Sequence, residues 1–177
     1  MAHDDVGVDP EHVERSHRFV VREASGDGDI DAVRRLVLAH VEERSYIPGV
    51  EHMAADAARL PGPYVPPHGA IWVADADGAI VGCVALRPLP NGTGEVKRMY
   101  VERDWRGVGI GRALLVTLIE AARALGYRCL RLGTLIEMVE AQALYRSLGF
   151  TPIERYRADE MIDTTFYELD LQYQQYQ

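Results

Sequence analysis

The sequence predicts a single α/β domain: a mixed, largely antiparallel sheet of about seven strands with a parallel central pair, flanked by about four helices. Two patterns favour this fold class. The pair Asp77-Gly78 lies between two apolar runs within 69–89, which is typical of a β-hairpin. A strand-like run at 94–101, a glycine-rich loop, an apolar helix and another strand follow, and such a crossover makes two neighbouring parallel strands.

The first elements are predicted from the spacing of apolar residues. Residues 17–24 alternate as a strand does, and the apolar residues from Ile30 to Val41 recur at helical spacing. Prolines and glycines interrupt the segment 48–68, which we interpret as a loop around a short helix near 51–60. We expect this irregular segment to form part of a substrate pocket.

The elements of the C-terminal half are predicted in the same way. After the hairpin, a turn at Asn91-Gly92 leads into the strand at 94–101. A helix follows the glycine-rich loop, and Gly126 is well placed to cap its C-terminus. Its apolar stripe consists of Leu114, Leu115, Leu118, Ile119, Ala122 and Leu125. The remaining pattern predicts a strand, a helix and two strands at 128–134, 138–148, 150–157 and 164–172.

The chain ends are expected to lie outside this domain. We predict a flexible leader at 1–17, the domain at 18–172 and a short tail at 173–177. The leader has no apolar signal-like region, and no run approaches the roughly 18 apolar residues of a membrane helix. We therefore expect a cytoplasmic protein that does not enter a membrane.

Composition excludes several classes of protein. The formal net charge of −8 disfavours nucleic acid as a partner and is compatible with a cationic substrate such as an amine. The two cysteines, Cys83 and Cys129, lie within apolar runs and are interpreted as buried thiols. His40, His52 and His68 lack the spacing of metal ligands, so we predict no metal site and interpret them as surface or packing residues.

The loop 106–111, Arg-Gly-Val-Gly-Ile-Gly, lies between the strand and the leucine-rich helix. The unpaired amides and the dipole at such a helix start favour an anion such as a pyrophosphate. A glycine cluster is also compatible with a simple tight connection. A nucleotide-binding loop fits less well, because Leu114 occupies the third glycine position of a dinucleotide motif and the Gly-Lys pair of a Walker loop is absent.

In its context, Arg106-x-x-Gly109-x-Gly111 resembles the acetyl-CoA signature of the GNAT superfamily of N-acetyltransferases. The segment ALYRSLGF at 143–150 resembles a second motif of that family, in which a tyrosine precedes a Leu-Gly-Phe turn. The resemblance covers about residues 18–172, with the specific motifs between 94 and 150. It implies transfer of an acetyl group from acetyl-CoA to a primary amine, by direct attack in a ternary complex.

The resemblance also implies where acetyl-CoA binds. The strand at 94–101 would separate from the strand at 128–134 and hold the pantetheine arm in a V-shaped opening, with a backbone N–H near Met99 donating to the thioester carbonyl. The amides of 107–112 would bind the pyrophosphate, with added charge from the Arg106 and Arg112 side chains. The implied cofactor-binding residues are Met99, Tyr100, Val101, Arg106, Gly107, Val108, Gly109, Ile110, Gly111, Arg112, Thr134, Met138, Ala141 and Tyr145.

Two residues are candidates for proton transfer. The resemblance implies that Tyr145 is the general acid that protonates the departing thiolate, and helical spacing turns its side chain inward with the apolar residues. The alternative is a core tyrosine with a bonded hydroxyl. Glu95 is the candidate base, since it shares one side of a regular strand with Lys97, Met99 and Val101. A bulge would turn it away, and the alternatives are a solvated charge at the strand end or an ion-pair partner of Lys97 or Arg98.

Other functions remain open at this point. Met138 occupies a position where the family often carries an asparagine that helps to hold the cofactor, whereas Ala141 matches the family pattern. An acyl-CoA-binding regulatory or interaction module of the same fold is therefore an alternative to an enzyme. The acceptor amine is not identified by any motif, and the family commonly forms homodimers.

Overall fold

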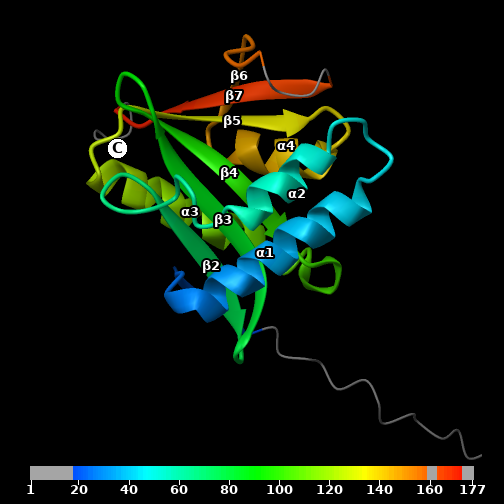
Figure 1. Ribbon diagram of the computed structural model, residues 1–177. Helices are drawn as coiled ribbons and strands as arrows, with labels where there is room; N and C mark the ends of the chain where they lie inside the picture. The colour runs from blue at the N-terminus through cyan, green and yellow to red at the C-terminus, as the bar shows by residue number, and fades with distance from the viewer. Residues whose placement is uncertain (1–17, 159–162, 173–177) are drawn as a thin grey trace, which may run out of the picture.

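The computed structural model describes residues 18–158 and 163–172 (Figure 1). The predicted leader 1–17 and tail 173–177 lie outside the described residues. Within the described part, seven strands form one sheet in the order β1-β2-β3-β4-β5-β7-β6, in which β4 and β5 alone run parallel. The predicted fold class is confirmed. The strands are β1 (Val20–Glu23), β2 (Ala70–Ala76), β3 (Ala79–Leu89), β4 (Thr93–Val101), β5 (Cys129–Leu135), β6 (Thr151–Ile153) and β7 (Thr164–Asp170).

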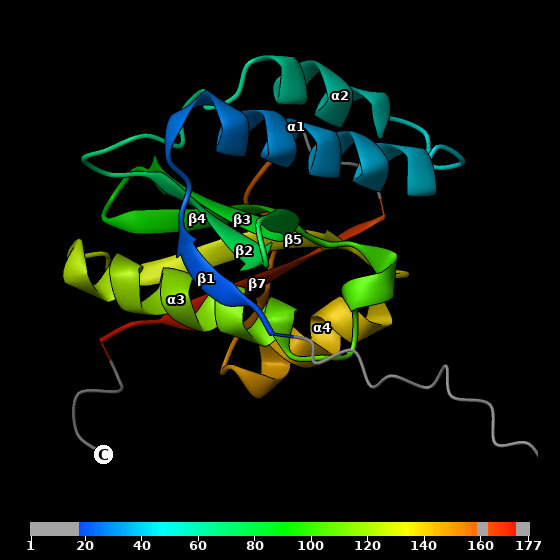
Figure 2. The ribbon, with the colours of Figure 1, turned by 90° about the horizontal axis from the view of Figure 1, so that it is seen from below.

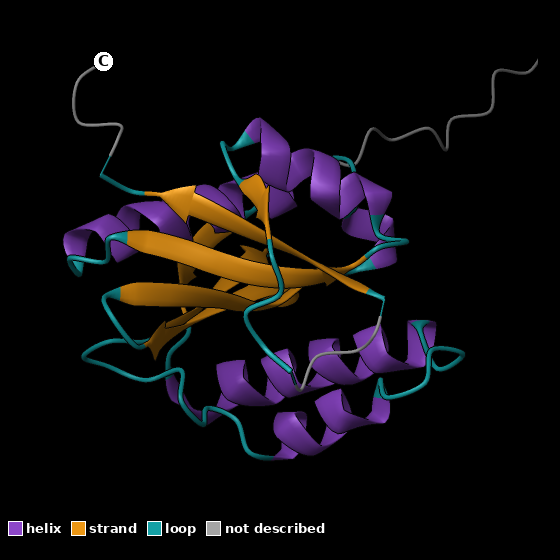
Figure 3. Cartoon of the chain, turned by 90° about the horizontal axis from the view of Figure 1, so that it is seen from above, coloured by secondary structure: helices purple, strands orange, loops and turns teal. Residues whose placement is uncertain are grey.

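Helices cover both faces of the sheet (Figures 2 and 3). On one face lie α1 (Gly26–Glu43) and α2 (Glu51–Ala58), and on the other lie α3 (Ile110–Ala124) and α4 (Val139–Ser147). The apolar residues accordingly form two buried clusters. The larger one contains the predicted stripe of α3 except Leu125, which is exposed. The smaller one contains Val33, Leu36 and Val37 of α1. Among the described residues, no helix has the length and apolar character needed to cross a membrane.

The predicted turns are confirmed by their backbone angles. Asp77 and Gly78 have φ of 52° and 90°, so both adopt the left-handed region that a tight hairpin turn requires. Gly126, with φ of 82°, follows the end of α3 as a C-terminal cap.

Three local predictions differ from the structure. The first helix begins at Gly26 rather than near Ile30, because its first turn is polar: the Asp29 carboxylate accepts a hydrogen bond from the Ser25 amide at 2.7 Å. The predicted strand 150–157 pairs with β7 only at Thr151–Ile153. A short 3-10 helix, Arg103–Trp105, precedes the glycine loop and has no apolar periodicity that would have predicted it.

Strand β4 contains a bulge that changes which residues share a face. Cys83 pairs with Tyr100 but Ala85 pairs with Lys97, so β4 carries one residue more than β3 between these pairs. The extra residue is Arg98, whose φ of 57° is unusual for a side chain of its size. Its carbonyl accepts a hydrogen bond from the thiol of Cys83 at 3.2 Å.

The bulge makes one prediction wrong. Glu95, Lys97, Met99 and Val101 do not share a side, because Met99 and Val101 pack against the cluster below α3. Tyr100 belongs to the cluster below α1, as Ala85, the partner of Lys97, does. Glu95 and Lys97 therefore face α1 and α2, whereas Met99 and Val101 face the other layer.

Strands β4 and β5 pair for only a short distance. Their register covers Thr93 with Cys129, Gly94 with Leu130 and Glu95 with Arg131, and no pair follows. Beyond Glu95 the two strands diverge, as Figure 1 shows. The opening lies at the middle of the sheet, between its antiparallel halves.

The two cysteines differ in burial. Cys83 is fully buried, whereas Cys129, at the paired end of β5, is half-buried. The interpretation of both as buried thiols is therefore confirmed only for Cys83.

Candidate active site

A cleft of about 620 Å³ lies between the end of β4, the loop after it and the start of α4. It brings together most of the residues predicted to bind the cofactor: Met99, Tyr100, Val101, Arg106, Gly107, Gly109, Ile110, Gly111, Arg112, Met138 and Ala141. Val108 lies outside it and packs against the larger apolar cluster. Thr134 and Tyr145 line a second, adjoining cavity instead.

The glycine loop presents free backbone amides to this cleft. Gly107 and Gly109 have φ of 81° and 93°, which other residues rarely adopt, and a Cβ at either position would meet no atom within 4 Å. Gly109 is the N-cap of α3 without a side-chain cap, and the Ala113 amide makes a helical bond to the Gly109 carbonyl at 3.0 Å. The amides of Ile110, Gly111 and Arg112 therefore lie in the open first turn, a site suited to a phosphate.

The Arg106 side chain links the glycine loop to the end of β4 and to α1. Its Nε donates to the Val101 carbonyl at 2.9 Å, and its terminal nitrogen donates to Glu43 of α1 at 2.8 Å. Although burial opposes the charged form, hydrogen bonds from Arg106 and Tyr100 hold the pKa of the Glu43 carboxyl below its usual range. The charge of Arg106 is thus balanced by Glu43, so its main effect here is to fix the loop against α1.

Arg44 supplies a donor that the described residues do not use. It lines the large cleft, and its Nε is buried without a hydrogen-bond partner among them. A buried donor of this kind is unfavourable unless a ligand pairs with it. Together with the glycine loop and the open edges of β4 and β5, it fits a long, polar, phosphate-bearing cofactor.

The second cavity, of about 120 Å³, lies where β4 and β5 diverge. Its walls come from Val96–Met99 of β4, Leu132–Leu135 of β5, His40 of α1 and Met53 of α2. Tyr145 reaches it from α4, on the other side of the sheet. His40, Met99 and Met138 line both cavities, so the two spaces adjoin.

Tyr145 is buried, with 5% of its surface exposed, and its ring packs against Phe150 and Tyr167 at centroid distances of 5.9 and 6.3 Å. Its hydroxyl makes no hydrogen bond to the described residues and is accessible from the cavity. Burial raises the pKa of this phenol to about 12, so it carries its proton at neutral pH. The hydroxyl is therefore available to donate into the cavity.

A buried polar network fixes α4 and was not anticipated from the sequence. The Tyr167 hydroxyl donates to Gln142 at 2.9 Å and accepts from Arg146 at 2.8 Å, and the Gln142 amide donates to the Ile136 carbonyl at 2.8 Å. Met138 is the N-cap of α4, and its sulfur accepts a long contact from the Thr134 hydroxyl at 3.8 Å. These bonds hold the helix that carries Tyr145 against β5 and β7.

Cationic and phenolic side chains donate hydrogen bonds to Glu95. Its side chain is fully buried, and its carboxylate accepts bonds from Arg87 at 2.6 Å, Arg157 at 3.1 Å and the Tyr156 hydroxyl at 2.9 Å. Glu95 is not among the residues that line either cavity. Glu95 is therefore an ion-pair partner, as one of the alternatives proposed. Its arginine partners are Arg87 and Arg157 rather than the predicted Lys97 or Arg98.

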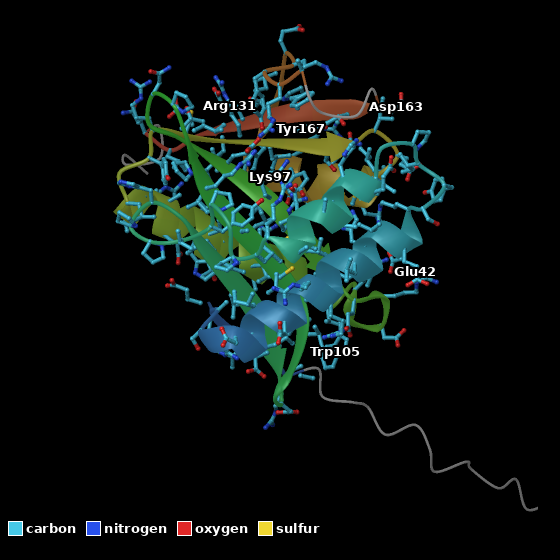
Figure 4. All side chains as sticks on the ribbon, viewed as in Figure 1. Glu42, Lys97, Trp105, Arg131, Asp163 and Tyr167 are labelled. Atoms are coloured by element: carbon cyan, nitrogen blue, oxygen red, sulfur yellow. The ribbon has the colours of Figure 1, made fainter. Side chains whose placement is uncertain are left out.

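The side chains that line the smaller cavity on the α1 and α2 side were not identified from the sequence. They include Lys97, which lies near the middle of the molecule where β4 passes behind α2 (Figure 4), and Arg98, whose guanidinium pairs with Asp56. Burial, reinforced by the charge of Arg44, lowers the pKa of His40 to about 4, so its imidazole is neutral. His40 is a cavity residue rather than surface packing. Among the described residues, no three His, Cys, Asp or Glu side chains gather as metal ligands would.

A sheet opened between parallel strands, with free helix amides at one end of the opening and an available phenol near the other, is the architecture of an acetyl-CoA-dependent acyltransferase. A family model described as an acetyltransferase (GNAT) domain matches residues 67–152. An uncharacterised N-acetyltransferase of Schizosaccharomyces pombe is 32% identical over 145 residues, which cover 81% of this chain and 89% of that protein. The chain belongs to the GNAT family of N-acetyltransferases, and acetyl-CoA is its acetyl donor.

Two further comparisons agree with this assignment. An acetyltransferase of Salmonella typhimurium, solved with its cofactor acetyl-CoA, superposes with a TM-score of 0.64 at 25% identity, covering 86% of this chain and 94% of that one. The N-acetylaspartate synthetase of Rattus norvegicus is 37% identical over 119 residues, or 66% of this chain. This chain spans only 37% of that relative's length.

Proposed function

We propose that the amine attacks the acetyl group directly while both substrates are bound, and that Tyr145 is the general acid. The observation that carries this proposal is the Tyr145 hydroxyl, which has no partner among the described residues and lines the cavity between the diverging strands. Bound acetyl-CoA supplies the thioester. The phenol would protonate the departing sulfur, which has an ordinary thiol pKa below that of the phenol, so proximity has to favour the transfer.

Three groups of this chain would hold the acetyl donor. The amides of Ile110, Gly111 and Arg112 would bind the pyrophosphate, and the open edge of β4 would pair with the pantetheine arm. The Met99 backbone N–H would donate to the thioester carbonyl and stabilise the negative charge that grows there. In other enzymes one such donor contributes about 3–4 kcal/mol.

The attacking amine must lose a proton, and Glu95 was the predicted base. Since both of its oxygens already accept bonds from arginines, we propose that Glu95 acts mainly as their counter-ion. Deprotonation would then run through water, because the lowered pKa of His40 makes its imidazole a weak base although it lines the cavity.

The competing function is a binding module that holds acyl-CoA without turning it over. Met138, which replaces the frequent asparagine, is the feature that favours it. The deciding experiment measures CoA binding by calorimetry and thiol release from acetyl-CoA with a broad panel of amines. Binding with release that is lost in Tyr145→Phe supports the enzyme, whereas binding without release across the panel supports the module.

The name of the rat relative states an acetylated amino acid, but this chain spans about a third of that protein. An amino-acid acceptor therefore has to be argued from the pocket of this chain. A cytoplasmic location and a homodimer are further predictions, tested by fractionation and by the mass in solution.

A further inference from the structure

The smaller cavity is lined by cations in a protein that is acidic as a whole. Lys97 and Arg98 line it, and none of its described lining residues is an aspartate or a glutamate. His40 is neutral there, so Lys97 and Arg98 are the charged side chains among the described lining residues. Arg98 also pairs with Asp56, which lies outside the described lining. The cavity therefore presents cationic hydrogen-bond donors, although the formal net charge of the chain is −8.

The bulge in β4 is what brings the two cations to one side. In a regular strand, consecutive side chains point to opposite faces. Here Arg98 forms an ion pair with Asp56 of α2, and Lys97 is paired in register with Ala85, which packs below α1. The positive φ of Arg98 is a strained conformation of the kind often found at functional sites.

We propose that the acceptor is a small amino acid, and that Lys97 and Arg98 bind its carboxylate while its amine faces the thioester. This inference rests on the proposed function, since it names the second substrate of the same site. The ammonium of Lys97 has three donors and the guanidinium of Arg98 has five, so each can bind a ligand oxygen in addition to its partners within the protein. Arg98 uses a single terminal nitrogen toward Asp56.

Donor chemistry and size both favour this acceptor over a polyamine. The side chains of Lys97 and Arg98 carry hydrogen-bond donors and no acceptor, so they can bind a carboxylate oxygen but not a second ammonium group. The cavity volume of about 120 Å³ lies well below the roughly 300–1,000 Å³ of pockets for drug-sized ligands, so the acceptor is small.

The test compares acceptors that differ only in the carboxylate. Glycine and L-aspartate are compared with their amides and with a diamine at saturating acetyl-CoA, and rates are expressed per concentration of unprotonated amine. Thiol release gives the rate, and mass spectrometry identifies the acetylated product. We expect the carboxylates to be preferred in kcat/KM by about tenfold to a hundredfold, the range of one charge-assisted hydrogen bond.

Lys97→Met should remove most of this preference by raising KM for the carboxylates, with little change for the amides. Lys97→Arg should retain it. Arg18→Gln removes the same charge at an exposed position next to β1 and should change neither acceptor class. Calorimetry with CoA on every variant should give unchanged affinity, which shows that the fold and the cofactor site are intact.

Two results would overturn the inference while leaving the proposed function in place. One is a wild-type preference for the amides or the diamine with normal CoA binding. The other is a carboxylate preference that survives in Lys97→Met. Absence of CoA binding by the wild-type protein would instead overturn the proposed function, and the acceptor assignment with it.

Discussion

Replacing Tyr145 with phenylalanine removes one oxygen from a ring that is otherwise fully packed. The Tyr145 hydroxyl makes no hydrogen bond to the described residues, so its loss breaks no bond there. Because this hydroxyl opens onto the cavity, the free energy of unfolding should change by less than about 1 kcal/mol. If the phenol is the general acid, kcat should fall by about 100-fold to 10,000-fold.

Tyr167 provides the matched control. It is equally buried, but its hydroxyl bonds to both Gln142 and Arg146. Tyr167→Phe should therefore lower the free energy of unfolding by about 1–3 kcal/mol with a much smaller effect on kcat. Urea unfolding and thiol release are measured on both variants. The reasoning is refuted if Tyr145→Phe keeps kcat within about threefold of wild type, or if it loses as much stability as Tyr167→Phe.

The pH profile of the wild-type enzyme gives a second check on Tyr145. Burial raises the pKa of the phenol to about 12, so the acid form persists through the whole physiological range. We expect kcat at saturating substrates to show no alkaline decline from this group below about pH 11. A decline centred near the ordinary tyrosine value of about 10, absent in Tyr145→Phe, would contradict the burial described here.

Three further predictions concern stability and cofactor binding. Because the native pKa of His40 is about 4 while that of the unfolded chain is near 6.5, the unfolded state binds an extra proton between these values. The free energy of unfolding should fall by up to about 3 kcal/mol as the pH drops through this window, and by less in His40→Gln, as urea titrations would show. Glu95→Gln should cost about 2–4 kcal/mol because it removes a fully buried counter-ion from two partly buried arginines, whereas Glu168→Gln, at a half-exposed pair, should cost less than about 1 kcal/mol. Gly109→Ala and Gly126→Ala should each cost about 1–2 kcal/mol, since both positions have positive φ and open space, but calorimetry should find weaker CoA binding only for Gly109→Ala.

The features that the sequence predicted are those encoded by neighbouring residues. Three examples are the Asp77-Gly78 turn, the glycine loop before α3 and the inward orientation of the Tyr145 side chain. Each depends on a few neighbouring residues, and the structure contains all three. They could be derived because turn geometry and helical spacing are local properties.

The features that escaped prediction depend on distant segments. The bulge at Arg98 arises from the register with β3 and is stabilised by the thiol of Cys83, and no turn-like residue marks it in the sequence. Glu95 receives a bond from Arg157, 62 residues further along the chain. Because of that bulge, alternation along β4 wrongly placed Met99 and Val101 on the side of Lys97.

The short pairing between β4 and β5 leaves the centre of the sheet with few backbone pairs. Three register pairs join β1–β4 to β5–β7 across this line. A bound pantetheine chain would act as an inserted strand there, so free coenzyme should contribute to the folded state by mass action. Amide hydrogen exchange along the outer half of β4 should slow as coenzyme is added, and the thermal midpoint should rise with its logarithm. For this enzyme, the cellular supply of coenzyme A would then help to set not only its rate but also how long the folded chain survives.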